Sequence, residues 1–93
     1  KASVQGTIVD NPVVLRQVAP VYPLAARRHG LEGTVVLLVS LDRDGVPSEV
    51  KVEVSSGRFD FDEAAQRAVR EWRFDPPKES GTYVRVRVEF RLK

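Results

Sequence analysis

The sequence contains no cysteine, no methionine and a single histidine, and these absences exclude several kinds of site. Without cysteine there is no disulfide framework, no thiolate metal site and no cysteine nucleophile. The lone His29 cannot build a two-histidine metal site or an H-E-x-x-H motif. No signal peptide is recognisable, and no stretch approaches the roughly 18 consecutive apolar residues of a membrane-spanning helix. The sequence therefore predicts no metal and no cofactor.

Length and charge limit the chain to one small domain. It has 93 residues, of which 42% are hydrophobic and 30% charged, values that are typical of a folded globular domain. Lys and Arg number 15 against 13 Asp and Glu, a formal charge of +2. This excess is too small to indicate nucleic-acid binding by itself.

Three stretches have the apolar patterns of β-strands. Residues 33–42 are apolar on both parities, which predicts a strand that is central in a sheet or covered on both sides. An Asp-Gly turn then leads into an alternating strand over residues 46–55, the pattern of a hairpin. Its inward residues are expected to be Val50, Val52 and Val54. Strict alternation over residues 83–93 predicts the last strand.

Two helices are expected between these strands. A short one over residues 22–30 would end at Gly30, which can adopt the left-handed conformation of a helix C-terminus. A longer amphipathic one over residues 61–74 follows Asp60, which with Glu63 has the spacing of a capping box.

The order of elements is an extended lead-in, a short helix, two strands, a long helix and a last strand. This order predicts an α+β two-layer sandwich, in which a small antiparallel three-stranded sheet packs against one long and one short helix. We expect the domain to span residues 14–93, with a short strand near Val13–Val18. Residues 1–13 form the lead-in, and the sequence leaves open whether they are ordered.

Residues that could carry catalysis have ordinary structural explanations. His29 would lie in the last turn of the short helix, where a histidine interacts favourably with the terminal carbonyls. Asp42 and Asp44 flank a hairpin turn, and Asp60 and Asp62 begin a helix. No phosphate loop, dinucleotide fingerprint or nucleophile elbow occurs. The sequence predicts that the domain is not an enzyme.

The last strand has an unusual outward face, because most of its outward side chains are cationic. These residues are Arg85, Arg87, Arg91 and Lys93, accompanied by Glu89 and Tyr83. One interpretation is a solvated face whose charges discourage aggregation of strand edges. A second is nucleic-acid binding, although only one aromatic residue is available for stacking. A third is capture of an extended peptide by strand addition.

Several groups of residues also occur together in a fixed order. They are Pro20-Val21-Tyr22-Pro23 with Ala25 and Gly33, Asp44-Gly45 before a strand that ends in Ser55-Ser56-Gly57, Asp62-x-Ala64-Ala65-x-x-Ala68-Val69-x-x-Trp72-Arg73-Phe74-x-Pro76, and the closing Val88-x-Phe90-x-Leu92. This ordered set resembles the C-terminal domain of TonB, the energy-transducer family of Gram-negative bacteria. The resemblance covers about residues 14–93.

The resemblance implies a periplasmic domain of an inner-membrane-anchored protein, whose anchor is not in this chain. In the family, this domain binds the TonB box, a short extended segment of outer-membrane TonB-dependent receptors, by strand addition. Through the anchor, an ExbB–ExbD complex supplies proton-motive-force energy for active uptake of substrates such as siderophores, haem or cobalamin. The resemblance implies no catalytic residue and no cofactor.

Carried onto this sequence, the resemblance implies two groups of contact residues. The strand that pairs with the receptor peptide consists of Arg85, Val86, Arg87, Val88, Glu89, Phe90, Arg91 and Leu92. The second group lies near the family's Q-P-x-Y-P segment and consists of Arg16, Gln17, Pro20 and Tyr22. This chain departs from that pattern, because Ala19 stands where the enteric members have glutamine.

Three other interpretations remain open at this point. A TolA-like periplasmic domain, which serves envelope integrity, would share the architecture. A self-pairing module would use the same last strand to form a homodimer. A nucleic-acid binder would show steep salt dependence.

Overall fold

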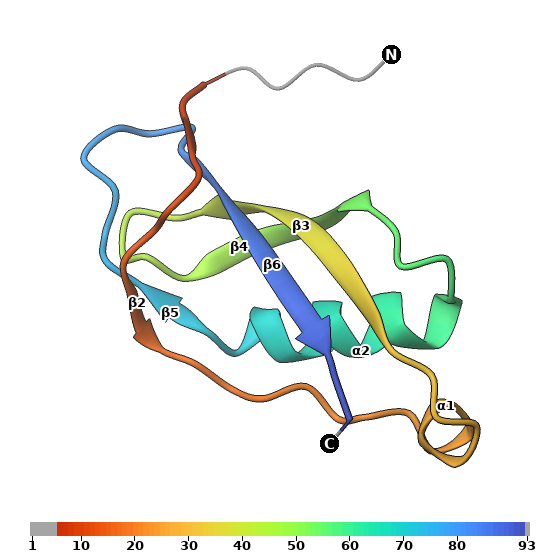
Figure 1. Ribbon diagram of the computed structural model, residues 1–93. Helices are drawn as coiled ribbons and strands as arrows, with labels where there is room; N and C mark the ends of the chain where they lie inside the picture. Colours follow the sequence, from red (N-terminus) through yellow and green to blue (C-terminus); the bar gives the residue numbers. More distant parts are fainter. Residues whose placement is uncertain (1–5, 93) are drawn as a thin grey trace.

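The domain is built on a four-stranded sheet, seen in a computed structural model that describes residues 6–92 (Figure 1). In spatial order the strands are β1 (Ile8–Val9), β6 (Tyr83–Phe90), β3 (Gly33–Leu41) and β4 (Pro47–Val54). β3 pairs antiparallel with both β4 and β6, whereas β1 runs parallel to β6. The remaining elements are β2 (Val14–Arg16), α1 (Leu24–Arg28), α2 (Phe59–Arg70) and β5 (Arg73–Phe74).

The expected α+β sandwich is confirmed, with β3 at the centre of its three long antiparallel strands. The expectation of a purely antiparallel three-stranded sheet was incomplete. β1 adds a fourth, parallel strand, and β2 pairs with β5 in a separate two-stranded sheet. The short strand expected near Val13–Val18 is present as β2. Its pairing with β5 and the pairing of β1 with β6 join distant parts of the chain, so they leave no local periodicity to detect. Of the lead-in residues 1–13, residues 1–5 lie outside the described range.

The core lies between one face of the main sheet and α2. β3 and β6 contribute alternate residues and α2 contributes its apolar stripe, as the periodicities predict. At one end of this core Phe61 stacks on Phe90 with ring centroids 4.5 Å apart, and Tyr22 meets both rings edge-on. Trp72, predicted to be buried, is 6% exposed.

The long helix differs from its predicted form at both ends. It ends at Arg70, because the chain turns at Trp72 and residues 73–74 pair with β2 as β5. The predicted capping box is wrong, since the N-cap residue is Arg58 and no side chain caps the helix. Asp60 instead pairs with the Arg58 guanidinium at 2.7 Å.

Asp62 links the first turn of α2 to the segment that precedes it. One carboxylate oxygen accepts hydrogen bonds from the Ser56 N–H at 2.9 Å and the Ser56 hydroxyl at 2.8 Å, and the other accepts from the Ser55 hydroxyl. Burial opposes ionisation of this carboxylate, but these hydrogen bonds outweigh it and hold the pKa of Asp62 below its usual value. The Ser55-Ser56-Gly57 turn is therefore held against the first turn of α2 by the Asp62 carboxylate.

The prediction that Val54 points inward is wrong. β4 has a β-bulge opposite Val36 and Leu37 of β3, so that Val54 is paired with Val36 and Val52 with Leu37. Val36 belongs to the sheet face away from α2, and directly paired residues share a face. Val54 therefore lies on that solvent-exposed face and is 54% exposed, while Val50 and Val52 pack against the core.

The predicted turn at residues 42–45 is confirmed and also contacts β5. The Asp42 carboxylate accepts hydrogen bonds from the N–H groups of Asp44 and Val46, both at 2.9 Å. Gly45 has φ +81°, and a Cβ there would lie 2.0 Å from the Phe74 carbonyl oxygen. The Gly45 carbonyl accepts the Phe74 N–H at 3.0 Å. Only glycine satisfies both this backbone conformation and this close approach.

Candidate peptide-binding edge

The two sides of β6 are paired to very different extents. Toward β3 the ladder runs without interruption from Tyr83 to Phe90. On the other side β1 covers only Tyr83 and Val84. From Arg85 to Phe90 no other strand of residues 6–92 pairs with this side, which is called the free edge below. Figure 1 shows β1 leaving β6 near its start, while the rest of β6 continues past it.

The backbone groups that point to the free edge belong to the odd-numbered residues of β6. The Tyr83 N–H donates to the Thr7 carbonyl at 2.7 Å on the β1 side, and the Thr82 carbonyl accepts from Leu41 at 3.1 Å on the β3 side. In a strand with antiparallel pairing, the direction of N–H and C=O alternates from residue to residue. Arg85, Arg87 and Glu89 therefore present their backbone donors and acceptors to the free edge.

The even-numbered residues of β6 serve the core. Val86, Val88 and Phe90 are 4%, 4% and 1% exposed, and their backbone groups face β3. Beyond the strand, the Leu92 N–H donates to the Glu32 carboxylate at 2.7 Å. Of the eight residues expected in the pairing strand, the odd-numbered ones thus lie on the accessible side.

β1 is held against β6 by side chains as well as by backbone pairing. The Asp10 carboxylate, directly after β1, forms an ion pair with the Arg85 guanidinium. Glu53 of β4 contacts the same guanidinium from the other side at 2.7 Å. The hydrogen bonds and charges of these carboxylates raise the pKa of Arg85, and the Arg85 hydrogen bond lowers the pKa of Glu53. Arg85 therefore has two acidic partners.

The other arginines of this face are less fully paired. Arg91 lies 4.0 Å from the Glu89 carboxylate and 3.3 Å from the Thr34 hydroxyl. Arg87 is exposed and makes no ion pair with any residue between Gly6 and Leu92.

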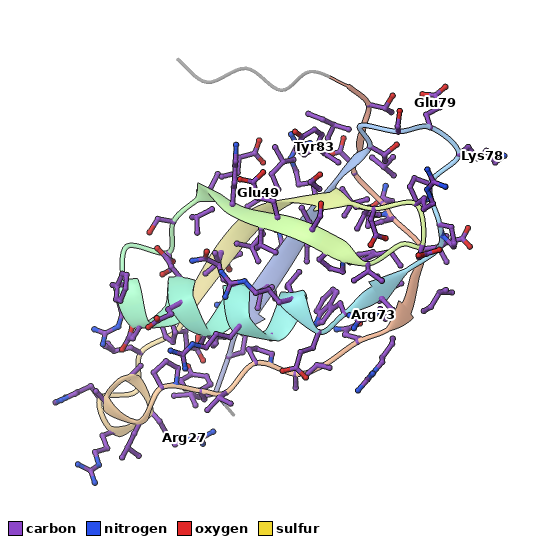
Figure 2. All side chains as sticks on the ribbon, turned by 180° about the vertical axis from the view of Figure 1, so that it is seen from behind. Arg27, Glu49, Arg73, Lys78, Glu79 and Tyr83 are labelled. Carbon is purple, nitrogen blue, oxygen red and sulfur yellow. The ribbon has the colours of Figure 1, made fainter. Side chains whose placement is uncertain are left out.

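The solvent-exposed face of the sheet continues beyond β6. At one of its ends Tyr83 and Glu49 lie on either side of Ser40, and Figure 2 shows these two side chains at the same end of the sheet. Charged side chains on this face therefore lie on β4 as well as on β6, on either side of the uncharged residues of β3.

The segment before the Pro-Val-Tyr-Pro motif is attached to the Trp-Arg-Phe stretch. Val14 and Arg16 of β2 pair with Phe74 and Arg73 of β5. The Trp72 indole N–H donates to the Val18 carbonyl at 2.8 Å. The segment directly before the Pro-Val-Tyr-Pro motif thus contacts the Trp-Arg-Phe stretch, and this contact holds residues 14–18 in an extended path.

Tyr22 packs against the core and is half-buried. Its hydroxyl donates to the Leu31 carbonyl, its ring contacts Phe61 and Phe90, and the Arg27 guanidinium lies 5.0 Å from its ring centre. The 5.6 Å between the Tyr22 and Phe90 rings places this segment beside the end of β6. Of the four expected contact residues here, Arg16 and Gln17 are exposed, while Pro20 and Tyr22 are half-buried.

Sequence reasoning missed β1 and the Asp10–Arg85 ion pair. The available signal was weak: two β-branched residues, Ile8 and Val9, stand before an Asp-Asn-Pro turn sequence. Which strand they would join could not be read from that pattern, because their partners lie about 75 positions later.

Two further features are absent from residues 6–92, a metal-ligand cluster and a membrane-spanning helix. No group of three or more His, Cys, Asp or Glu side chains is placed to hold a metal ion in this range. Within the same range, no helix has the length and apolar character needed to cross a membrane.

Comparison with protein families agrees with this geometry. Residues 18–93 match the model of the Gram-negative bacterial TonB protein C-terminal domain. The chain belongs to the TonB C-terminal domain family. TonB proteins are non-enzymatic energy transducers with a role in transport, so the family assignment supports the prediction that the domain is not an enzyme.

Individual TonB relatives are similar over most of this chain. It is 45% identical over 87 residues to protein tonB2 of Pseudomonas aeruginosa, an alignment that covers 88% of this chain and 32% of that protein. It is 37% identical over 92 residues to protein TonB of Vibrio cholerae, covering 96% of this chain and 38% of that protein. The chain thus spans about a third of the length of these relatives.

Two solved TonB structures share the fold. The solution structure of the Pseudomonas aeruginosa TonB C-terminal domain superimposes with a TM-score of 0.69 at 30% identity, covering 86% of this chain and 85% of that one. The Vibrio anguillarum TonB2 protein superimposes with a TM-score of 0.66 at 28% identity, covering 100% and 94%. The TonB fold therefore extends over the whole sandwich described above.

Proposed function

We propose that this domain is the periplasmic receptor-binding part of a TonB energy transducer, and that it binds the TonB box of outer-membrane receptors by strand addition to β6. The observation that carries the proposal is the free edge. β6 is paired along its full length to β3, yet from Arg85 to Phe90 its other side has no strand partner in residues 6–92. A strand with one unpaired side can accept an extended peptide through backbone hydrogen bonds.

The free edge offers enough length for a short peptide. Six residues at about 3.3 Å each give a ladder of about 20 Å, in which three residues direct both backbone groups outward. Specificity for particular side chains is not required for this pairing, because the hydrogen bonds involve only the backbone.

The segment around residues 16–22 is proposed as a second, smaller contact. Arg16 and Gln17 are exposed on a path fixed by β5 and Trp72, and this path ends beside Phe90. We assign receptor contacts to Arg16 and Gln17, and a supporting role to Pro20 and Tyr22, which hold the segment in place.

In the whole protein, this domain would transmit energy from the proton-motive force, supplied through an ExbB–ExbD complex at the inner membrane, to receptors for active uptake. The family match favours this function over the TolA-like alternative.

The test is a titration of the ¹⁵N-labelled domain with a synthetic TonB-box peptide, followed by amide chemical shifts. We expect weak binding, with the largest shifts at Arg85, Arg87 and Glu89 and smaller ones at Arg16 and Gln17. The matched control is the same peptide with one central residue replaced by proline. It should bind poorly, because it loses a backbone donor. Shifts confined to α2 or to the turn at residues 42–45 would refute the edge model.

Self-pairing of β6 competes with peptide binding for the same free edge. Sedimentation velocity over a range of protein concentrations separates the two. A monomer that binds the peptide supports the proposal. A dimer that dissociates on addition of the peptide also supports it, whereas a dimer that excludes the peptide favours a dimerisation module.

A further inference from the structure

Among the strands of the main sheet, β1 has the smallest attachment to its neighbour. It pairs with β6 at two residues only, whereas β3 pairs along the whole of β6. The Thr7 carbonyl accepts the Tyr83 N–H at 2.7 Å, and the Thr7 hydroxyl donates to the Glu79 carboxylate at 3.2 Å. Residues 6–10, called the β1 segment below, are therefore the part of this sheet whose opening breaks the fewest bonds.

Gly6 holds the β1 segment against the loop that precedes β6. Its φ is +128°, and a Cβ at this position would lie 2.1 Å from the Gly81 carbonyl oxygen. Any other residue would have to move the segment away from Gly81 to relieve this contact. Position 6 thus offers a substitution that loosens the β1 segment without changing the core or the free edge.

The charges around Arg85 allow the β1 segment to leave without isolating an ion. The Asp10 side chain is 64% exposed, so its carboxylate is readily hydrated when the ion pair with Arg85 opens. Arg85 retains Glu53, whose two carboxylate oxygens accept hydrogen bonds from it at 2.7 and 3.1 Å. The sheet can therefore lose the Asp10 ion pair and regain it while Arg85 stays paired.

Stronger attachments follow directly after the β1 segment and limit how far the chain can open. The Val13 carbonyl accepts the Asp75 N–H at 3.0 Å, and the Val18 carbonyl accepts the Trp72 indole N–H at 2.8 Å. Between these two contacts β2 pairs with β5, as Figure 1 shows. Detachment that stops before Val13 would lengthen the chain by at most about 25 Å, at about 3.3–3.6 Å per extended residue.

We infer that the β1 segment is a load-sensitive cover on β6, which tension on the N-terminal side of the domain detaches while the rest of the fold stays intact. This inference rests on the proposed function, in which the membrane anchor pulls on the domain from that side. Detachment frees the backbone groups of Tyr83, so that the free edge extends from residues 85–90 to residues 83–90. The ladder available to an added strand then grows from about 20 Å to about 26 Å.

Tension and an added strand would then favour the same state. A strand that reaches Tyr83 takes the place of β1 and keeps the β1 segment detached. Because coupling between two equilibria is reciprocal, tension that detaches the β1 segment must strengthen the binding of such a strand. The connection between transducer and receptor would therefore hold more firmly when it is under load.

The first measurement pulls single domains in optical tweezers. The chain has no cysteine of its own, so handles can be attached through Lys1→Cys and Arg67→Cys. Arg67 is exposed on α2, away from both the β1 segment and the free edge. We expect a reversible extension of at most about 25 Å at a force below that of global unfolding. The absence of any step before unfolding would overturn the inference.

Two glycine variants assign this step to the β1 segment. Gly6→Ala should abolish the step or lower its force and, without tension, should speed hydrogen exchange of the Tyr83 amide by about tenfold or more. Gly57→Ala is the matched control, because Gly57 also has a positive φ, +93°, but nothing lies within 4 Å of the added Cβ. It should lower the force of global unfolding and leave the first step unchanged. Equal effects of both variants on the first step would overturn the inference.

The second measurement adds TonB-box peptides of two lengths, six residues and the same six extended by two residues at each end. NMR titration first locates each peptide on the β6 amides. The longer peptide should also shift the Tyr83 amide and should prevent the first step from re-forming when the force is lowered, whereas the shorter one should do neither. Gly6→Ala should bind the longer peptide about three- to tenfold more tightly than wild type and the shorter one equally, because more molecules are already open.

The outcomes separate this inference from the proposed function. If the longer peptide binds at β6 but leaves the first step unchanged, the inference is overturned and strand addition stands. The same holds if Gly6→Ala changes the affinity for both peptides equally. Absence of binding at β6 by either peptide would refute the proposed function, and the inference with it.

Discussion

The two sides of β6 differ in how much of the strand is paired: the β3 side is fully paired and the β1 side is mostly unpaired. On the β3 side the pairing runs the length of the strand, and the same residues that pair there bury Val86, Val88 and Phe90 in the core. On the opposite side only two residues pair with β1, and the residues that point there carry charged side chains. One strand thus fixes the fold with its even-numbered residues and leaves its odd-numbered residues available for binding.

This division explains how an unpaired edge is compatible with a stable fold. Natural sheets protect exposed edges with charged side chains and with short covering segments. β1 covers the start of the edge, and Arg85, Arg87 and Glu89 give the rest a charged border. Non-specific pairing is discouraged, while the backbone groups of Arg85, Arg87 and Glu89 remain without a strand partner in residues 6–92.

The largest change in the free energy of unfolding is expected from a substitution in the hydrophobic core beneath β6. Trp72→Ala removes a side chain that is 6% exposed and its hydrogen bond to Val18, and should lower the free energy of unfolding by about 3–5 kcal/mol. Urea unfolding followed by circular dichroism measures this change. Normal stability combined with lost peptide binding would contradict it and would make Trp72 a contact residue.

The next change compares the two sides of β6 directly, with one proline placed at each of two neighbouring positions. Val88→Pro removes an N–H that faces β3 and a buried valine, and should cost about 2–4 kcal/mol. Glu89→Pro removes an N–H that faces the free edge, where proline is tolerated. It should cost less than about 1 kcal/mol but abolish peptide binding.

Thermal unfolding and the peptide titration together check this pair. The comparison between the two sides fails if Glu89→Pro unfolds the domain as readily as Val88→Pro. It also fails if the folded Glu89→Pro domain binds the peptide with unchanged affinity.

A change away from β6 should affect stability alone. Asp62→Ala leaves the donors of Ser55 and Ser56 without their acceptor and should cost about 1–3 kcal/mol at neutral pH, with peptide binding retained. The pKa of Asp62 is lowered in the folded state, so its contribution is complete above about pH 4 and declines as the pH falls further.

Unfolding curves measured between pH 7 and pH 3 test the sign of this effect. The difference in stability between wild type and Asp62→Ala should be largest at neutral pH and should shrink as the pH falls below about 4. A difference that grows toward acid pH would contradict the assignment.

The smallest effect is expected where β1 meets the free edge. Asp10→Ala removes an ion pair in which the Asp10 side chain is 64% exposed, so the thermal midpoint should change little. Loosening of β1 should nevertheless speed hydrogen exchange of the Tyr83 amide, which donates to Thr7, by a few-fold. The Val86 amide, which faces β3, is the internal control and should be unaffected.

Much of the fold could be predicted from periodicity, because the long strands and α2 carry their own patterns. Alternation over residues 83–93 identified the last strand with its valines inward, and this strand is observed as Tyr83–Phe90. The apolar run over residues 33–42 identified the central strand, which is observed as Gly33–Leu41. Alternation failed at Val54, since a bulge shifts the parity of a strand without changing the sequence pattern. Spacing suggested a capping box of Asp60 with Glu63, but Asp60 pairs with the Arg58 guanidinium instead.

The candidate site was only partly accessible from the sequence for a related reason. The last strand could be selected by its cationic face and by resemblance to TonB. Which of its residues direct their backbones outward depends on the β3 register, and how much edge remains depends on β1. Both are pairings between distant segments, and single-residue patterns do not specify them.

The place of β6 in the sheet also determines when this domain can fold. Among residues 6–92, β6 follows all the other elements, yet it lies between β1, the first strand of this range, and β3. Until Phe90 is available, β3 and β4 form only a two-stranded ribbon, and β1 has nothing to join. Closing the loop of about 75 positions between Asp10 and Arg85 is a late and comparatively slow event. A chain that is being synthesised or translocated therefore remains incompletely folded until β6 is available. The free edge forms in the same step that completes the sheet.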